Sequence, residues 1–554
     1  MALRKVAASC AGAAVAGCGA LYAADPTTAK RTYTLYTEMA PVVVAYRLLE
    51  QKQKLRRDWN GFENPARDDA EWEALHARYA KPTVDCMRRM LGSYVKLGQF
   101  LALRPDIVPD SWTRHLRTLE NAVPPQATAL VHATICESYG VATVEDVFAE
   151  FDDAPLGSAS IGQVHRARLR DGREVAVKVQ YGAGNEHVMR TDIRNGKRAA
   201  TLLAPEQVAV LDEIEAQFAT EFDYRKEAAN LRAVRRNLKR AGFVRDCPAW
   251  LPRPLRRLLR GAVDVPEPVD DLCTKDVLVM SFMNGTNLVD GIAKLGAKAA
   301  QREGVDLETL VARMKRKFDR EGYPEPYAGP PAYVLEGFRA ADALRCRAVN
   351  CGVLLRRGLA RLRGAPLPPW REPLLDDFNP AKVMSTLCAV HGHELLVDGL
   401  FNGDPHAGNF LLLDDGTIGC IDYGQVKQLS DDERHWLCRC YVALSTEDAL
   451  KLRDLAREIG MRSRYNTDLV RLKMLTFSLD RDGKDVTDGL NFQQFMDKMY
   501  ALDPWDDVVP MIIMPSRLCV FIRGIGLMMN HPVSCTKEFL PIARKVLRDE
   551  NVAY

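Results

Sequence analysis

The sequence lacks cysteine pairs at the short, fixed spacing that a zinc site requires. Its 14 cysteines are scattered, and no two of them form a CxxC motif. Isolated thiols in a reducing compartment are the better interpretation. A basic stripe interleaved with aromatic residues is also missing, and the net charge is only +3, so we expect no nucleic-acid partner.

Long apolar runs are absent beyond the N-terminus, so we expect the body of the protein to be soluble or peripheral to a membrane. Residues 1–24 hold Arg4 and Lys5 but no acidic residue, and residues 6–24 are uncharged and rich in alanine and glycine. A mitochondrial presequence, a short membrane anchor and a secretory signal are the three interpretations, and the unpatterned cysteines do not favour the last. We favour an organelle address that merges into an anchor, over residues 1–30.

The remaining composition is that of an ordinary globular protein, with 47% hydrophobic and 27% charged residues. A chain of 554 residues is too long for one typical core, so we expect two or three packed units. Residues 31–150 are predicted to be helical, residues 151–290 to mix strands with helices, and residues 376–554 to be mostly helical. Residues 291–375 are predicted to be an insertion.

The predicted insertion contains a linker rich in proline and glycine, followed by an arginine-rich stretch. Seven arginines lie between residues 339 and 363, where the only acidic residue is Asp342. Such a stretch is either a solvated helix or a basic helix that lies on an anionic membrane surface. Together with the N-terminal apolar segment, it leads us to expect association with a membrane.

One polar motif, GDPHAGNFLLLDDGTIGCIDYGQ at 403–425, concentrates hard oxygen ligands. Asp404 and Asn409 are five residues apart in a loop, and two short strands joined at Asp415–Gly416 return the chain to Asp422. The hairpin should bring Asp422 beside Asn409, as Mg²⁺ on a nucleotide requires. The spacing matches the catalytic loop and the metal-binding strand end of protein kinases. The alternative is two acidic turns that cap a hairpin.

A second candidate is Lys178 in the predicted strand EVAVKVQ, where three valines share one face and Lys178 lies on the other. A lysine on a central strand is costly unless an opposite charge meets it. ATP phosphates and a helix carboxylate would do so, as in the V-A-I-K strand of kinases. Glu227 is the best such carboxylate, and Glu221 is its competitor. An edge-strand lysine that points to water is the alternative.

The turn before this strand has fewer glycines than the GxGxxG loop of kinases. It reads GSASIG over residues 157–162. Backbone amides can still approach a phosphate group there, because the side chains are small. The stiffer backbone predicts a different placement of the nucleotide, and an ordinary turn of small residues is the alternative.

Farther upstream, the segment KLGQ presents two polar side chains beside a glycine. Gly98 costs about 1 kcal/mol in a helix relative to alanine, which indicates close packing. Lys96 and Gln99 are three residues apart and share a helix face. This face can lie over the predicted site and meet Glu221 or Asp223. A solvated helix face with one packing glycine is the alternative.

Together these segments resemble the UbiB-type atypical kinases, also called aarF-domain-containing kinases. The matching segments follow the family's order and read KLGQ, PLGSASIGQVHRA, VAVKVQ, EFDYRKEAANL, GDPHAGN and IDYGQ. The combination of KxGQ with the ASIGQ loop is not shared with ordinary kinases. The resemblance covers residues 75–290 and 376–445, and the N-terminal apolar segment and the run WEALHARYA are most like the mitochondrial branch.

The resemblance implies an α+β fold with a two-lobed, protein-kinase-like core, a helical N-terminal extension that carries the KxGQ helix, and a helical C-terminal region. It implies ATP and Mg²⁺ as cofactors. Lys178 with Glu227 would bind the ATP phosphates, Asp404 would be the catalytic aspartate, and Asn409 and Asp422 would bind Mg²⁺. The residues that it places around the nucleotide are Gly157, Ser158, Ala159, Ser160, Lys178, Lys96, Gln99, Glu221, Asp223 and Met280.

The sequence departs from the family pattern at several positions. Gly157 stands where the loop usually begins with alanine, and Asn402–Gly403 replaces the usual His-Ala. Ala407 replaces a proline, Tyr423 a phenylalanine, and Ser281 the acidic residue that is common in the hinge-like segment. None of these changes removes a charged residue of the predicted site.

The family's association with coenzyme Q and mitochondrial lipid homeostasis implies an ATPase or unorthodox kinase at the mitochondrial inner membrane, with lipid or quinone-pathway partners. A nucleotide-gated scaffold of a membrane enzyme complex is one alternative, because a helix over the cleft would not admit a protein substrate. A small-molecule phosphotransferase is another, because Gly403–Asp404 resembles the loop of those enzymes, although KLGQ and ASIGQ argue against it.

Overall fold

The computed structural model describes residues 26–60, 65–90, 92, 94–95, 97–98, 108–119, 125–158, 161–182, 184–203, 222–247, 259–321, 327, 329–371, 379–490, 492–505 and 509–554. The predictions for the segment 1–25 fall outside these ranges. So do the predictions for Lys96, Gln99, Ala159, Ser160 and Glu221.

The chain is organised in two compact units. The first contains the described residues up to Ala229 and the strand segment Glu267–Phe282. The second contains Asn230–Pro266, Met283–Leu490 and Gln494–Tyr554. The boundary at residue 229 falls inside one helix, α9 (Tyr224–Arg240).

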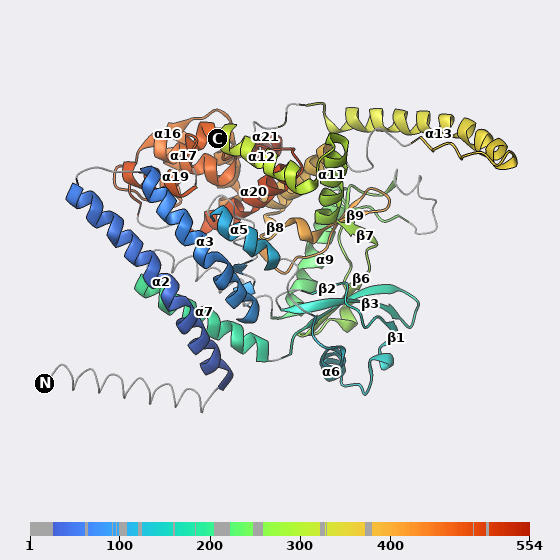
Figure 1. The fold of residues 1–554 in the computed structure, drawn as a ribbon, viewed down its shortest axis with the longest axis horizontal. Helices are drawn as coiled ribbons and strands as arrows, with labels where there is room; N and C mark the ends of the chain where they lie inside the picture. The colour runs from blue at the N-terminus through green and yellow to red at the C-terminus, as the bar shows by residue number, and fades with distance from the viewer. Residues whose placement is uncertain are drawn as a thin grey trace. The chain divides into compact units, whose positions relative to one another are not determined.

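The first unit is built on an antiparallel sheet (Figure 1). Its strands are β1 (Phe148–Phe151), β2 (Gly157–Ser158), β3 (Gly162–Leu169), β4 (Glu174–Gln180) and β6 (Val277–Ser281). They lie in the order β1-β3-β4-β6, with β2 paired to β3, so β4 is a central strand. The turn between β3 and β4 contains Gly172, whose φ of 87° suits a residue without Cβ.

The alternation of EVAVKVQ places one face of β4 in the core of this unit. Val175, Val177 and Val179 are buried in one apolar cluster with Val277 and Val279 of β6. Helix α6 (Thr128–Tyr139) packs against the same cluster (Figure 1). Because successive strand residues face opposite sides, Lys178 lies on the face away from this core.

The N-terminal part of the first unit is helical, as predicted. Its helices are α2 (Pro26–Asn60), α3 (Pro65–Met90) and α5 (Asp110–Leu116), and the later helix α7 (Gly184–Leu203), which follows β4 in the chain, packs against α2. Arg31 of α2 forms an ion pair with the buried Asp192 of α7, and Nδ2 of Asn195 donates to Oγ1 of Thr32 over 2.8 Å. These polar contacts fix α2 against α7.

The KLGQ segment confirms the expectation of close packing at its glycine. A Cβ atom on Gly98 would lie 2.3 Å from Cδ1 of Leu119 and 3.3 Å from Sδ of Met87. Leu119 is fully buried, in a cluster with Val84 and Leu116. A side chain at position 98 would therefore fit only if the buried Leu119 moved, because Gly98 packs closely against α3 and the end of α5.

The second unit contains two small sheets. The larger one has the order β5-β10-β9-β7, made of β5 (Val263–Asp264), β10 (Ile418–Cys420), β9 (Phe410–Leu413) and β7 (Gly285–Asn287). The antiparallel β9–β10 hairpin turns at Gly416, where φ is 86°, as the sequence predicts. The smaller sheet pairs β8 (Leu400–Asn402) with β11 (Val426–Gln428).

Helices make up most of the second unit. They are α11 (Leu288–Glu303), α12 (Leu307–Glu321), α13 (Ala332–Leu362), α14 (Pro380–His393), α15 (Asp431–Ser445), α16 (Ala449–Glu458), α17 (Asp468–Leu479), α18 (Lys484–Thr487), α19 (Phe492–Leu502), α20 (Pro510–Met528) and α21 (Cys535–Asp549). Among the described residues, α20 alone is long and apolar enough to cross a membrane, but 56% of its apolar window is buried. Since α20 packs against α14 and α17, it is a core helix of this unit.

Candidate nucleotide and metal site

The residues predicted to bind phosphate meet at β4 and the first turn of α9. Nζ of Lys178 lies 2.8 and 3.0 Å from the two carboxylate oxygens of Glu227. Their side chains are only 11% and 5% exposed, so this is a largely buried ion pair. The ring centroid of Tyr224 lies 5.3 Å from the same ammonium group. The structure thus brings Lys178 to Glu227, the first of the two carboxylates considered.

The end of the small-residue loop is held tightly beside this ion pair. A Cβ atom on Gly162 would lie 2.5 Å from the carbonyl oxygen of Val179 and 2.6 Å from the hydroxyl of Tyr224. By contrast, a Cβ atom on Gly157 would meet no atom within 4 Å. The glycine at 162 is therefore required by packing, whereas the departure from the family at 157 is sterically neutral.

The other predicted nucleotide contacts of the first unit are placed as follows. Ser158 lies in β2, and Met280 is buried in β6, where it pairs with Ala176. Asp223 precedes α9 and accepts hydrogen bonds from Nε and Nη2 of Arg225, each over 2.8 Å. These bonds lower the pKa of the Asp223 carboxyl below its usual range.

In the second unit, a buried asparagine connects the two halves of the polar motif. Oδ1 of Asn402 accepts from the backbone N–H of Asp404, and Nδ2 of Asn402 donates to the carbonyl of Asp422, both over 2.9 Å. Nδ2 of Asn409 donates to the carbonyl of Asp404, also over 2.9 Å. Asn402, a departure from the family pattern, therefore joins the Asp404 loop to the strand end that carries Asp422.

The donor set of this motif fits a magnesium ion on a nucleotide. The amide nitrogen of Asn409 is used within the loop, so its oxygen is the atom it can offer to a metal. Asp422 accepts from the backbone N–H of Gly424 through Oδ1, over 3.0 Å. One amide and one carboxylate are too few for a protein-only site, and among the described residues no group of three or more metal-binding side chains occurs. Mg²⁺ commonly takes its remaining ligands from phosphate and water.

Sequence reasoning missed the residue that contacts Asp404. Nη2 of Arg517, on α20, lies 2.9 Å from Oδ1 of Asp404, and each side chain is 17% exposed. Nη1 of Arg517 donates to Oε1 of Gln425 over 2.9 Å. An arginine in the otherwise apolar run MIIMPSRLCVFI was the available signal, because a charge in a core helix requires a partner.

Tyr423, another departure from the family pattern, is explained by a buried polar chain. Its hydroxyl donates to Oε1 of Glu394 over 2.9 Å, and Oε2 of Glu394 lies 2.9 Å from Nδ1 of His391. All three side chains are buried. Burial raises the pKa of the Tyr423 hydroxyl well above its ordinary value, so the group stays a neutral donor to the carboxylate.

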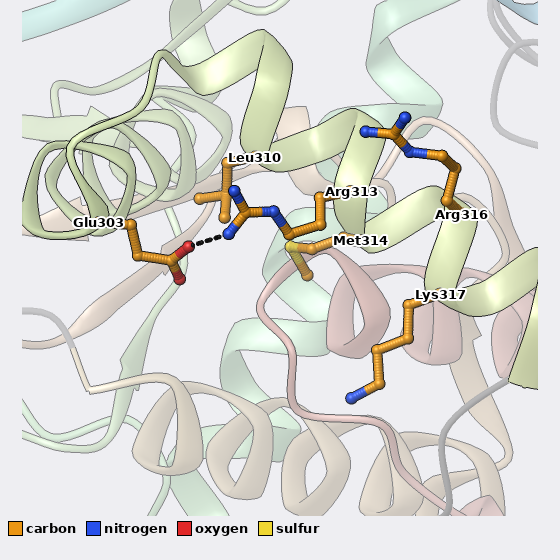
Figure 2. Close-up of a pocket in the computed structure, with 6 residues that line it drawn as sticks. All are labelled: Glu303, Leu310, Arg313, Met314, Arg316 and Lys317. Atoms are coloured by element: carbon orange, nitrogen blue, oxygen red, sulfur yellow. Dashed lines mark hydrogen bonds and ion pairs between the residues drawn. The ribbon is translucent and has the colours of Figure 1, made fainter.

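A separate cavity of about 450 Å³ lies between α11 and α12 (Figure 2). It is lined by Glu303, Leu310, Arg313, Met314, Arg316 and Lys317. Nη1 of Arg313 donates to Oε2 of Glu303 over 2.7 Å, as Figure 2 shows. None of the predicted nucleotide or metal residues lines this cavity.

Comparison with known proteins identifies the family. The ABC1 atypical kinase-like domain matches residues 118–322 and 362–456, which is more than half of the chain. The chain therefore belongs to the ABC1 atypical kinase-like family, whose members include the UbiB-type proteins, and the predicted kinase-like α+β fold is confirmed. The match omits residues 323–361, nearly all of α13, within the predicted insertion.

Named relatives agree with this assignment. A probable protein kinase UbiB of Pseudomonas aeruginosa is 31% identical over 47% of this chain and 46% of its own length. ACTIVITY OF BC1 COMPLEX KINASE 8, chloroplastic, of Arabidopsis thaliana is 31% identical over 54% of this chain and 37% of its own length. Mouse AarF domain-containing protein kinase 1 is 29% identical over 39% of this chain and 38% of its own length.

The matched regions are partial. This chain spans about half the length, or less, of the curated relatives that it matches. A solved structure of the Rv3197–erythromycin complex from Mycobacterium tuberculosis is 21% identical and covers 81% of this chain and 91% of its own, with a TM-score of 0.40.

Proposed function

We propose that the protein is a magnesium-dependent ATP-using enzyme that acts in mitochondrial lipid or coenzyme Q homeostasis. Its reaction would be ATP hydrolysis or phosphoryl transfer to a lipid-like or small molecule, rather than conventional protein phosphorylation. The buried ion pair between Lys178 and Glu227 carries this proposal. A largely buried lysine ammonium held by one carboxylate is the arrangement that kinases use to position ATP phosphates.

The predicted catalytic and metal-binding residues each have a role in this proposal. Lys178 neutralises phosphate charge, and Glu227 fixes its ammonium group in place. Asp404 orients the attacking hydroxyl or water, and Asn409 and Asp422 hold Mg²⁺. When bound, Mg²⁺ supplies charge neutralisation at the transferring phosphoryl group. Asn402 keeps the Asp404 loop and the Asp422 segment in register, through its two hydrogen bonds.

Magnesium-dependent ATP turnover tests the proposal. Asp422→Asn removes the carboxylate assigned to Mg²⁺, and we expect turnover to fall by at least about 100-fold, since an interaction with the developing charge is lost. Asp432→Asn, an exposed change at the start of α15, is the matched control and should turn over like the wild type. Unchanged turnover in Asp422→Asn would exclude the enzymatic proposal.

A nucleotide-gated scaffold is the second candidate, and one contact favours it. Arg517 forms an ion pair with the carboxylate of Asp404. This ion pair competes with the acceptance of a proton by the same carboxylate. A scaffold would bind nucleotide through Lys178 without turning it over. Affinity capture with and without ATP separates the two candidates. If the captured partners are the same with and without ATP, and the same for the wild type and Lys178→Ala, the scaffold is excluded.

A mitochondrial inner-membrane location belongs to the same proposal. It is supported by the acid-free N-terminal segment with Arg4 and Lys5, and by an organellar relative that is described as chloroplastic. Import of the full chain into isolated mitochondria, followed by carbonate extraction, tests the location. Lipid and quinone profiling of cells that lack the protein tests the pathway, and unchanged profiles would contradict it.

A further inference from the structure

Helix α13 carries a continuous apolar face that no part of the described structure covers. The face recurs at helical spacing, and every one of its residues is exposed. It consists of Tyr333, Gly337, Ala341, Leu344, Ala348, Cys351, Leu355, Leu359 and Leu362. Leu344, Leu355 and Leu362 are 68%, 73% and 85% exposed. An uninterrupted exposed stripe of this kind marks an interaction site rather than scattered surface residues.

Part of the opposite face of α13 is covered by the protein's own chain, although Phe338 and Val349 on that side remain 64% and 39% exposed. The segment that follows the helix runs back along it (Figure 1). Nδ2 of Asn350 donates to the carbonyl of Arg371 over 2.9 Å, and Oδ1 of Asn350 accepts from the N–H of Arg371 over 2.8 Å. The guanidinium of Arg357 lies 4.9 Å from the ring centroid of Trp370. The orientation of α13 about its axis is therefore fixed, with the apolar face outward.

Positive charge predominates on the exposed surface of α13. Among its charged residues, the exposed ones are all arginines, namely Arg345, Arg347, Arg356 and Arg361. At 100° per residue, Arg345 and Arg356 flank the apolar face on one side, and Arg347 and Arg361 flank it on the other. Asp342 lies on the opposite side of the helix, whereas Glu336 lies on the same side as Arg347 and Arg361, where its carboxylate is held by Arg339 at 3.2 Å.

We propose that α13 is a docking surface for an anionic lipid bilayer. The apolar face inserts at the boundary between headgroups and acyl chains, while the flanking arginines bind lipid phosphates. At 1.5 Å per residue, a helix of 31 residues extends about 46 Å along the surface. Tyr333, which lies on the apolar face and is 77% exposed, is an aromatic residue of the kind that favours this boundary.

A second copy of the chain is the less suitable occupant. Packing two such faces together would set arginines from both copies along one seam, where like charges repel. A bilayer with phosphate headgroups offers apolar chains to the face and negative charge to its flanks at the same time. The observed charge pattern therefore favours the lipid surface.

Cys351 provides a local reporter that needs no engineered label site in the chain. It is an exposed free thiol in the middle of the apolar face. Vesicles of phosphatidylcholine with phosphatidylglycerol should slow its modification by a maleimide, read by peptide mass spectrometry, whereas phosphatidylcholine alone should not. Cys247, a half-buried thiol outside α13, is the internal reference and should react at the same rate throughout.

Variants separate the two parts of the proposal. Leu344→Asn with Leu355→Asn should abolish the protection of Cys351, because the inserted side chains are lost, and the fold should persist because both are exposed. Leu450→Asn, an exposed leucine of α16 at 58%, is the matched control and should keep the protection. Each of Arg345→Gln and Arg356→Gln should weaken vesicle binding by about fivefold, corresponding to about 1 kcal/mol.

Three results would overturn the proposal. Equal reactivity of Cys351 with and without anionic vesicles excludes insertion of the face. Equal protection by phosphatidylcholine alone excludes the role of the arginines. Protection that rises with protein concentration in the absence of lipid shows a second copy instead. The inference does not rest on the nucleotide site. In the Asp422→Asn variant, anionic vesicles should protect Cys351 from the maleimide as they do in the wild type.

Discussion

At the scale of single residues, the contact between Arg517 and Asp404 decides what the candidate catalytic loop can do. Arg517 spans two acceptors, the carboxylate of Asp404 and the side-chain oxygen of Gln425. The Asp404 loop itself carries no lysine or arginine between residues 403 and 409. A guanidinium supplied from α20 places positive charge beside the aspartate, where a transferring phosphoryl group would develop negative charge.

We expect Arg517→Met to lower ATP turnover by about 100-fold, with nucleotide affinity little changed, because the arginine acts on developing charge. Arg517→Lys should recover part of the turnover, since one ammonium group retains the charge but cannot span both acceptors. Steady-state turnover and equilibrium nucleotide binding measure the two effects separately. Faster turnover in Arg517→Met would show instead that the ion pair is inhibitory.

The ion pair between Lys178 and Glu227 makes a prediction about stability that does not depend on turnover. Removing one partner leaves a largely buried charge, so Lys178→Met alone or Glu227→Leu alone should each cost about 3–5 kcal/mol. The double variant should cost much less than the two single variants together, because neither charge is then left unpaired. Urea unfolding of all four proteins measures this cycle. Additive losses would show that the two groups do not interact.

Tyr423 gives a third prediction at this scale. Tyr423→Phe restores the residue of the family pattern, yet we expect it to lower the free energy of unfolding by about 1–3 kcal/mol. The buried Glu394 would lose the hydroxyl that donates to Oε1. Tyr465→Phe removes a hydroxyl from a side chain that is 62% exposed and should change stability by less than about 0.5 kcal/mol. Equal effects of the two changes on denaturant midpoints would contradict the role of Glu394.

At the scale of elements, two glycines with opposite surroundings test how tightly the loop and the KLGQ segment are packed. Gly98→Ala forces a Cβ atom against the fully buried Leu119, so we expect a loss of about 1–3 kcal/mol. Gly157→Ala meets open space and should stabilise the protein by about 0.4–1 kcal/mol, through the unfolded chain. Thermal unfolding of the two variants measures both changes in stability. A Gly98→Ala variant that is more stable than the wild type would refute the close packing at this glycine.

Sequence periodicity predicted the elements well where local pattern decides. The alternation in β4 separated the buried valines from Lys178, and the turn residues fixed both hairpins. The pairing of Lys178 with Glu227 followed from charge, because a lysine on a central strand requires a partner. A basic helix was predicted for this stretch, but not which of its faces points outward, since the covering segment around Trp370 has no periodic signal.

At the scale of the whole molecule, pattern alone could not find contacts between residues that are distant in sequence. Arg517 of α20 reaches Asp404, and Glu394, in the segment Glu394–Asp398 that follows α14 and packs against β8, reaches Tyr423. A sequence indicates that a buried charge needs a partner, but tertiary packing chooses which one. The predicted domain boundaries, including the insertion at 291–375, stay predictions.

The C-terminal end of α21 is held by one contact between residues that are distant in sequence. Because this contact involves an ionisable carboxyl group, the free energy of unfolding depends on pH. Glu550, just beyond α21, accepts hydrogen bonds from Arg434 of α15, at 2.6 and 2.8 Å, and also contacts His435. The Arg434 guanidinium is the main cause that lowers the pKa of Glu550 from 4.5 to about 2. Because the folded pKa lies below the unfolded one, the stabilisation is present above pH 4.5 and is lost as the pH falls toward 2.

The free energy of unfolding of the Glu550→Gln variant should therefore differ from that of the wild type mainly above pH 4.5. Since the Glu550 side chain is 38% exposed, solvent screening limits the difference to about 1 kcal/mol near neutral pH. The difference between the two free energies of unfolding should shrink steadily from pH 4.5 toward pH 2, because protonation removes the charge that the variant never had. Denaturant unfolding over a pH series measures it, and a difference that stays constant through the window would show that the ionised carboxylate does not hold α21 to α15.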